Sequence, residues 1–172
     1  MLEKGYIQVY TGNGKGKTTA ALGITLRSIC AGNKVFFGQF MKGQDYSEKK
    51  APECLSGLTM EQFGGKCFIN GKPTEKDISD AKTGLKRMEE VLSSGQYDLV
   101  VFDEINTALF FKLVTVEEVM AVLDRKPEKT EVVLTGRYAP QEIIDRADLC
   151  TEMREIKHYY NAGVDARVGI EK

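Results

Sequence analysis

The sequence contains one histidine, no tryptophan and four cysteines. The cysteines, Cys30, Cys54, Cys67 and Cys150, form no CxxC pair, and neither they nor the single histidine provide the ligand spacing of a zinc site. Cysteines scattered in this way, in a chain that can build its own core, are typical of reduced thiols in a cytosol. We therefore expect a cytoplasmic protein with no zinc site.

Long apolar runs and an excess of one charge are also missing. No segment reaches the ~18–20 apolar residues of a membrane span, and the first residues, MLEKGYIQVYTG, lack the apolar segment of a signal peptide. The 24 Lys and Arg residues nearly balance the 25 Asp and Glu residues, which gives a net charge of −1. Nonspecific electrostatic binding to nucleic acid is therefore not expected, and neither is a membrane partner.

The composition that remains is that of an ordinary globular protein. The 172 residues, 42% of them apolar and 28% charged, suit a single domain that spans residues 1–172. A chain of this length buries roughly 70% of the surface that it exposes when unfolded. We therefore expect a core that needs no disulfide or metal to hold it together.

Strand and helix patterns alternate along the chain. Apolar and β-branched runs predict strands at residues 6–10, 34–40, 58–63, 98–103, 131–136 and 148–153, the last of them at an edge. Helical periodicity and capping signals predict helices at residues 18–29, 74–94, 115–126 and 140–147. This alternation predicts a three-layer α/β/α fold with a mainly parallel sheet covered by helices on both faces.

The strongest motif is TGNGKGKTT at residues 11–19, between an apolar strand and an Ala-rich helix. Its glycines allow successive backbone N–H groups to point at a polyphosphate, and the helix adds the positive end of its dipole. Lys17 supplies a mobile positive charge, and Thr18 offers a hydroxyl to Mg²⁺. The pattern is that of a P-loop, with Thr11 in place of the usual first glycine.

A second element supplies carboxylates for a metal. The run LVVFDE, residues 99–104, delivers Asp103 and Glu104 at the carboxyl end of a buried strand, where open α/β sheets bind their ligands. If the chain stays extended there, the two side chains point to opposite sides, and they do not both ligate one ion. A guanine-reading NKxD tetrad is absent from the sequence, which favours ATP over GTP.

These motifs leave the cleaved bond of ATP open. A small-molecule kinase or ATPase would use Asp103 or Glu104 to orient a hydroxyl or water and would release ADP. A binding module that responds to ATP without turnover is a third alternative.

Five sequence blocks together resemble the P-loop corrinoid adenosyltransferase family, which acts on cob(I)alamin or cob(I)yrinic acid a,c-diamide. They lie in the family's order over nearly the whole chain: VYTGNGKGKTTAALG (9–23), GQFMKG (38–43), LVVFDEIN (99–106), VVLTGR (132–137) and KHYYNAGVDARVGIE (157–171). The resemblance implies a P-loop NTPase-like (RecA-like) fold. It also implies transfer of the 5′-deoxyadenosyl group of ATP to a Co(I) corrinoid, with release of tripolyphosphate, in adenosylcobalamin biosynthesis or salvage.

The resemblance also implies cofactors, partners and residue roles. It implies Mg²⁺, with Mn²⁺ as an alternative, a flavoprotein-type electron donor that makes Co(I), and a homodimer. Thr18 and Glu104 would ligate the metal, with Asp103 behind them, and Lys17, Thr18 and Glu104 would be the catalytic residues. The residues expected to bind ATP are Gly12, Asn13, Gly14, Lys15, Gly16, Lys17, Thr18, Thr19, Arg27 and Arg137.

On the corrin side the resemblance implies Phe68, Lys42 and His158. Phe68 matches the first of two family aromatics that displace the lower axial ligand of Co(II), whereas Asn70 stands at the second position. Lys42 and Arg137 end predicted strands and could face phosphate or corrin carboxamides. Solvent-facing or packing roles are the alternatives for Arg27, Lys42, Phe68, Arg137 and His158.

Overall fold

The computed structural model describes residues 2–43, 46–65 and 72–172. In this part of the chain six strands form one parallel sheet in the order β3-β2-β4-β5-β1-β6. The strands are β1 (Ile7–Thr11), β2 (Val35–Phe40), β3 (Leu58–Phe63), β4 (Leu99–Asp103), β5 (Glu131–Thr135) and β6 (Leu149–Glu152). The parallel sheet predicted from the continuous apolar runs is therefore confirmed.

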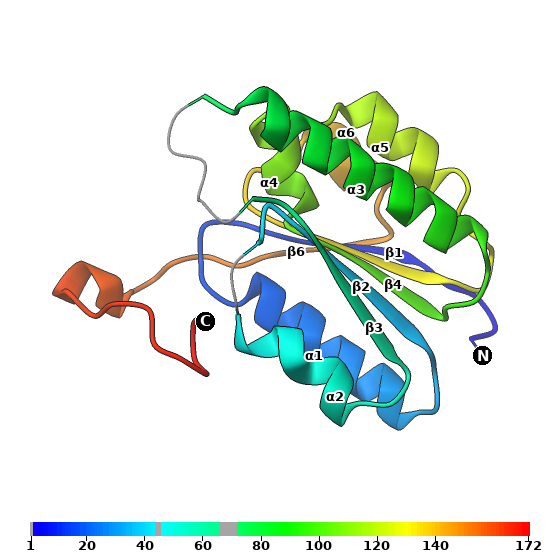
Figure 1. Cartoon of the computed structure of the whole chain (residues 1–172), viewed down its shortest axis with the longest axis horizontal. Helices are drawn as coiled ribbons and strands as arrows, with labels where there is room; N and C mark the ends of the chain where they lie inside the picture. Colours follow the sequence, from blue (N-terminus) through cyan, green and yellow to red (C-terminus); the bar gives the residue numbers. More distant parts are fainter. Residues whose placement is uncertain (1, 44–45, 66–71) are drawn as a thin grey trace.

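Helices cover both faces of the sheet and give the predicted three layers (Figure 1). One face carries α1 (Lys17–Cys30) and the short α2 (Ala51–Cys54). The other face carries α3 (Glu75–Ser93), α4 (Ile105–Phe110), α5 (Val116–Leu123) and α6 (Gln141–Arg146). Two 3₁₀ turns, η1 (Ser47–Lys50) and η2 (Tyr159–Ala162), lie in stretches without a sequence signal for a helix.

The core consists of two apolar layers, one on each face of the sheet. On the α1 side Phe37, Val101 and Val133 pack with Ala21 of the helix, all of them fully buried. Neighbouring strand residues such as Phe36 and Phe102 point to the other face and meet α3 and α5. The central strands are buried on both faces because they carry apolar residues at successive positions. By contrast, all four residues of β6 are exposed, as expected of an edge strand.

Local capping signals fix where two helices start. Thr74 with Asp77 and Thr115 with Glu118 both form reciprocal capping boxes, so both predicted starts are confirmed. Helix α3 ends at Ser93, and Gly95 takes a left-handed conformation with a φ of 63° just beyond it. These helices are placed mainly by short sequence signals.

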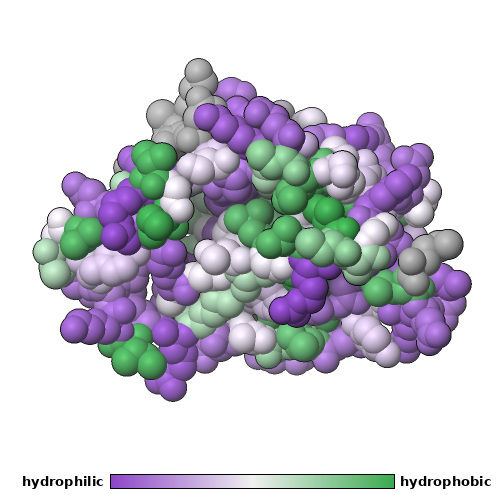
Figure 2. Space-filling model, turned by 90° about the horizontal axis from the view of Figure 1, so that it is seen from below, coloured by the Kyte–Doolittle hydropathy of each residue, from purple (hydrophilic) through white to green (hydrophobic). Residues whose placement is uncertain are grey.

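Seen from the side that carries α1 and α2, hydrophilic residues cover most of the rim, and hydrophobic residues gather near the centre (Figure 2). After β6 the chain leaves the sheet as a tail that stands beside the body of the molecule (Figure 1). None of the helices in the described ranges has both the length and the apolar character that crossing a bilayer requires.

Candidate active site

The phosphate loop, residues 12–16, connects the carboxyl end of β1 to the amino end of α1. Gly12 and Gly16 have φ values of 97° and 121°, which side chains rarely allow. A Cβ atom at Gly12 would lie 2.4 Å from the Met153 carbonyl oxygen, and one at Gly14 would lie 2.8 Å from the carbonyl carbon of Arg154. The segment after β6 thus packs directly on the loop, and glycine is required by space as well as by conformation.

Thr11, which occupies the usual first glycine position, joins the loop to its surroundings. Its backbone oxygen accepts from the Met153 amide at 2.8 Å, and its hydroxyl accepts from the Ala139 amide at 3.2 Å. The next turn of the loop is held similarly, because the Gly14 amide donates to the Met153 carbonyl at 2.7 Å. The substitution of the first glycine is therefore accommodated by a hydrogen bond that glycine could not make.

Lys17 is buried at the foot of the loop, with 6% of its surface exposed. Its ammonium group donates to the carbonyl oxygens of Gly12 and Gly14 at 2.9 and 2.8 Å. Burial lowers the pKa of Lys17, and the nearby Glu104 carboxylate acts against that shift. The loop thus holds a positive charge where a polyphosphate would need one.

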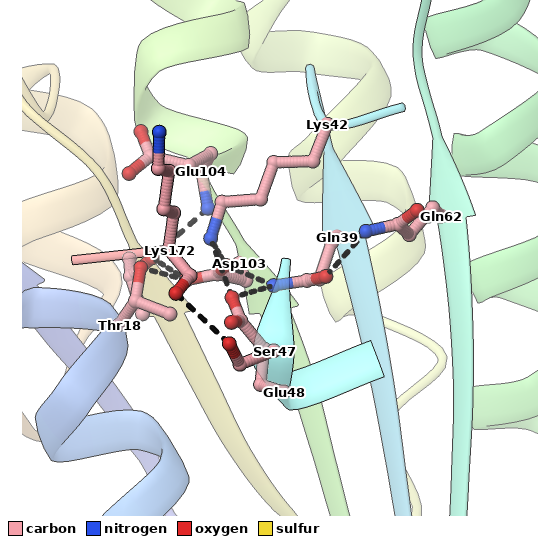
Figure 3. A network of polar contacts seen from close by, with 10 residues as sticks. Thr18, Gln39, Lys42, Ser47, Glu48, Gln62, Asp103, Glu104 and Lys172 are labelled. Atoms are coloured by element: carbon pink, nitrogen blue, oxygen red, sulfur yellow. Dashed lines mark hydrogen bonds and ion pairs between the residues drawn. The ribbon is translucent and has the colours of Figure 1, made fainter. Parts of the chain in front are cut away.

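Asp103 is fully buried at the carboxyl end of β4, where it accepts hydrogen bonds from four donors of the described chain. Its Oδ1 accepts from the hydroxyls of Thr18 at 2.9 Å and Thr135 at 2.7 Å. Its Oδ2 accepts from the amide of Gln39 at 3.1 Å and the ammonium of Lys42 at 3.0 Å (Figure 3). Two carboxylate oxygens offer about four lone-pair sites, so these donors engage all of them.

Lys42 follows β2 and lies between two carboxylates. Its ammonium group is 3.0 Å from Asp103 and 3.4 Å from Glu48, and it sits 5.0 Å from the centre of the Tyr46 ring. Burial alone would lower the pKa of Lys42, but the two carboxylates outweigh burial and raise it. Because Glu48 belongs to η1, the ion pair fastens that turn to the end of the sheet.

Glu104 begins α4 in a left-handed conformation with a φ of 62°, so the chain is no longer extended at this residue. Its amide donates to the Thr135 hydroxyl at 2.9 Å, and its carboxylate accepts from the Thr107 hydroxyl. Burial raises the pKa of Glu104, and repulsion from Asp103 raises it further. The two adjacent carboxylates therefore differ: Asp103 is enclosed by protein donors, whereas Glu104 lines a cavity.

That cavity has a volume of about 1130 Å³, above the ~300–1,000 Å³ of most small-molecule sites. It brings together most of the residues expected to bind the substrates. The predicted residues on its wall are Gly14, Lys15, Gly16, Lys17, Thr18, Thr19, Lys42, Glu104, Arg137 and His158. This volume exceeds what a nucleoside triphosphate alone would fill.

The other predicted residues are placed differently. Gly12, Asn13 and Asp103 lie behind the wall, in the loop or bonded to Thr18. Arg27 does not line this cavity: it lies in the last turn of α1, ~15 Å along the helix from Lys17. Arg27 is thus placed apart from the phosphate loop, and its contact with nucleotide stays a prediction. Phe68 and Asn70 lie outside the described residues.

The tail after β6 closes one side of the cavity. His158 caps η2 by accepting from the Tyr160 amide at 3.1 Å, and both residues line the cavity. Farther along, the Ile170 carbonyl lies 3.5 Å from the Lys15 ammonium, and the Lys172 carbonyl accepts from the Ser47 hydroxyl at 2.9 Å. The tail thus bridges the phosphate loop and η1.

Several site residues carried no sequence signal strong enough to be singled out. Gln39 donates to both Asp103 and Glu48, and its own carbonyl accepts from Gln62 at 3.0 Å. Thr135 contacts both acidic residues. The available clue was a polar residue at or near the carboxyl end of an apolar strand, a position that open α/β sheets use for ligands.

Comparisons with known proteins give a consistent result. The profile described as "ATP:corrinoid adenosyltransferase BtuR/CobO/CobP" matches residues 3–171. A corrinoid adenosyltransferase of Escherichia coli K12 is 32% identical over 169 residues, which cover 98% of this chain and 86% of the relative. One from a Sinorhizobium species is 35% identical over 179 residues, covering 98% and 81%.

Among solved structures, the flagellar accessory protein FlaH of Methanocaldococcus jannaschii has a similar fold. The TM-score is 0.62 at 15% sequence identity, and the match covers 88% of this chain and 72% of FlaH. At this identity the likeness concerns the fold alone, and it agrees with a RecA-like α/β arrangement.

Proposed function

The chain belongs to the ATP:corrinoid adenosyltransferase family, and from this premise we propose how its residues transfer the 5′-deoxyadenosyl group of ATP to the cobalt of a Co(I) corrinoid. In this reaction the electron pair of Co(I) forms a bond to C5′. The C5′–O5′ bond breaks, and its electron pair leaves with tripolyphosphate. Membership of the family disfavours the kinase, ATPase and binding-module alternatives.

The leaving triphosphate is bound by the phosphate loop in this proposal. Residues Gly12 to Thr19 present backbone N–H groups, Lys17 contributes a buried positive charge, and Arg137 adds a second charge that also lines the cavity. These groups stabilise the negative charge that grows on the oxygen leaving C5′. The observation that carries the proposal is this positively charged loop, which opens into a cavity lined by residues predicted for both substrates.

The donors at the sheet edge fit a magnesium ion, with Mn²⁺ as an alternative. Mg²⁺ prefers hard oxygen ligands, and it usually takes one or two carboxylates together with substrate phosphates and water. The Thr18 hydroxyl and the Glu104 carboxylate would hold the ion, and Asp103 would act through Thr18 because its oxygens are engaged by other donors. A bound ion would neutralise triphosphate charge.

Reactivity itself comes from Co(I), a strong nucleophile that needs no protein base. The residues therefore position C5′ against cobalt and keep water away from the site. The Lys42 ammonium belongs on the phosphate side of the cavity in this proposal, since it bonds Asp103, the partner of Thr18. His158 lies on the tail side and is proposed, together with Phe68, to face the corrinoid.

We also propose that the protein works in the cytoplasm as a homodimer, with a flavoprotein-type donor that supplies the electron for Co(I). The experiment that tests the function follows both products. Purified protein, Mg-ATP and chemically reduced corrinoid are mixed, the light-sensitive Co–C bond is followed in the visible spectrum, and phosphorus NMR identifies the released phosphate. Tripolyphosphate in equal amount to alkylated corrinoid is expected. ADP, or an unchanged ATP signal, would refute the proposal.

A further inference from the structure

Two half-exposed aromatic rings line the cavity together with the phosphate loop. Phe110 ends α4 and is 52% exposed, and Tyr138 follows Arg137 and is 50% exposed. Their ring centres are 4.3 Å apart with an angle of 32° between the planes, and both line the cavity. The two rings therefore form one wide apolar surface that is not used to fill the core.

The backbone at this surface is held in an uncommon conformation. Tyr138 has a φ of 60°, in the left-handed region that residues other than glycine seldom adopt. Gly136, two residues earlier, has a φ of 133°, and a Cβ atom there would lie 2.7 Å from the Thr107 amide. A large side chain kept in a strained turn while half exposed points to a ligand contact, because packing gains too little to explain it.

We infer that Phe110 and Tyr138 form the surface on which the corrin macrocycle of the substrate lies, and that they set the enzyme's affinity for corrinoid. This inference rests on the proposed function. A corrin presents a broad apolar face and a polar edge of amide or carboxylate side chains. The paired rings match the apolar face. Their half-exposed apolar faces suit the corrin, whereas the polar groups around Lys17 and Thr18 suit the triphosphate.

Adenine is the other flat group that could stack on these rings, and the experiment separates the two. The variants are Phe110→Ala and Tyr138→Gly, the second of which removes the ring and relaxes the left-handed turn. Tyr138→Phe keeps the ring and is the matched control. Tyr6→Ala removes a ring of similar exposure, 45%, just before β1, at the amino end of a strand whose carboxyl end leads into the phosphate loop.

The readouts are the separate KM values for corrinoid and ATP and the Kd of hydroxocobalamin by equilibrium dialysis. For Phe110→Ala and Tyr138→Gly we expect the corrinoid KM and the hydroxocobalamin Kd to rise roughly tenfold, since a stacked ring contributes about that factor. The KM for ATP should stay within twofold, and both control variants should resemble wild type. Tyr138→Gly should melt no lower than wild type.

Two results would overturn the inference. One is an unchanged corrinoid KM and Kd in both ring-removing variants. The other is a rise confined to the KM for ATP, which would assign the rings to adenine. Because the Kd of hydroxocobalamin is measured without turnover, the inference can fail while wild type still makes adenosylated corrinoid. The same binding measurement still tests the inference if wild type makes no adenosylated corrinoid.

Discussion

Replacing Glu104 with glutamine should make the protein more stable and the enzyme slower. Gln has the shape of Glu, and its amide oxygen can still accept from the Thr107 hydroxyl. The substitution removes a carboxylate. Burial raises the pKa of that carboxyl group, and repulsion from Asp103 raises it further. That charge is the one we propose to hold the metal, so its loss should lower turnover at least tenfold and weaken the dependence on Mg²⁺.

The sign of the stability change depends on pH. The folded state raises the pKa of Glu104, so folded protein retains that proton to a higher pH than unfolded protein does. The contribution of Glu104 to the stability of wild type is therefore fully present below the ordinary pKa of a glutamate and is lost as the pH rises through the folded-state pKa. We expect the unfolding free energy of Glu104→Gln to exceed that of wild type at pH 8 and to match it near pH 4.

Asp103→Asn is the matched comparison, because it removes the adjacent charge from a different environment. The amide nitrogen would face donors, and within the described residues Lys42 would keep Glu48 as its carboxylate partner. Breaking a buried ion pair costs about 3–5 kcal/mol, and the remaining Glu48 contact places our expectation near the lower value. Asp103→Asn should therefore be clearly less stable, yet its metal dependence should change less than that of Glu104→Gln.

Urea unfolding followed by circular dichroism, at pH 4 and pH 8 and without nucleotide or metal, measures both stabilities, and a Mg²⁺ titration of turnover measures the metal roles. The reasoning fails if Glu104→Gln is destabilised at pH 8 or turns over within threefold of wild type. A titration in which only Asp103→Asn is impaired would exchange the roles assigned to the two carboxylates.

Three further predictions test other parts of the site. Lys17→Ala should lose about 2–4 kcal/mol of transition-state stabilisation, and a kcat within threefold of wild type would contradict its role. Gly12→Ala should lower the unfolding free energy by about 1–3 kcal/mol from backbone strain alone. Gly23→Ala has open space around its added Cβ and should raise the unfolding free energy by about 1 kcal/mol. Equal urea midpoints for the two variants would refute this. Phe68→Ala should abolish the conversion of Co(II) corrinoid to a four-coordinate visible spectrum with Mg-ATP bound, and an unchanged spectrum would make Phe68 a packing residue.

The parts of the site that could be predicted are those encoded by short stretches of sequence. The phosphate loop, the acidic strand end and the capping boxes at Thr74 and Thr115 each depend on residues a few positions apart. The surroundings of Asp103 depend instead on strand order, since Gln39 and Thr135 reach it from the strands on either side of β4. Strand order is a property of the whole chain, so those contacts could not be predicted from local patterns.

Two other features depended on conformation rather than on residue type. The left-handed turn at Glu104 has no local marker such as glycine or asparagine, and it redirects the carboxylate that an extended strand would have aimed elsewhere. Arg27 was assigned to nucleotide by resemblance to the family, whereas its distance from the loop follows from its place in the last turn of α1. The short helix α4 was missed because six residues are too few for a periodic pattern.

The contact between the phosphate loop and the segment after β6 has a consequence for the order of folding. The loop is made near the start of the chain, yet Thr11 and Gly14 are held by the backbone of Met153. A ribosome releases residues 11–19 long before residue 153, and domains form contacts only among residues already made. The nascent chain therefore lacks the wall that shapes its phosphate loop until almost the whole protein is synthesised. Nucleotide affinity should accordingly appear late and abruptly during synthesis, because the site depends on a contact between distant parts of the chain.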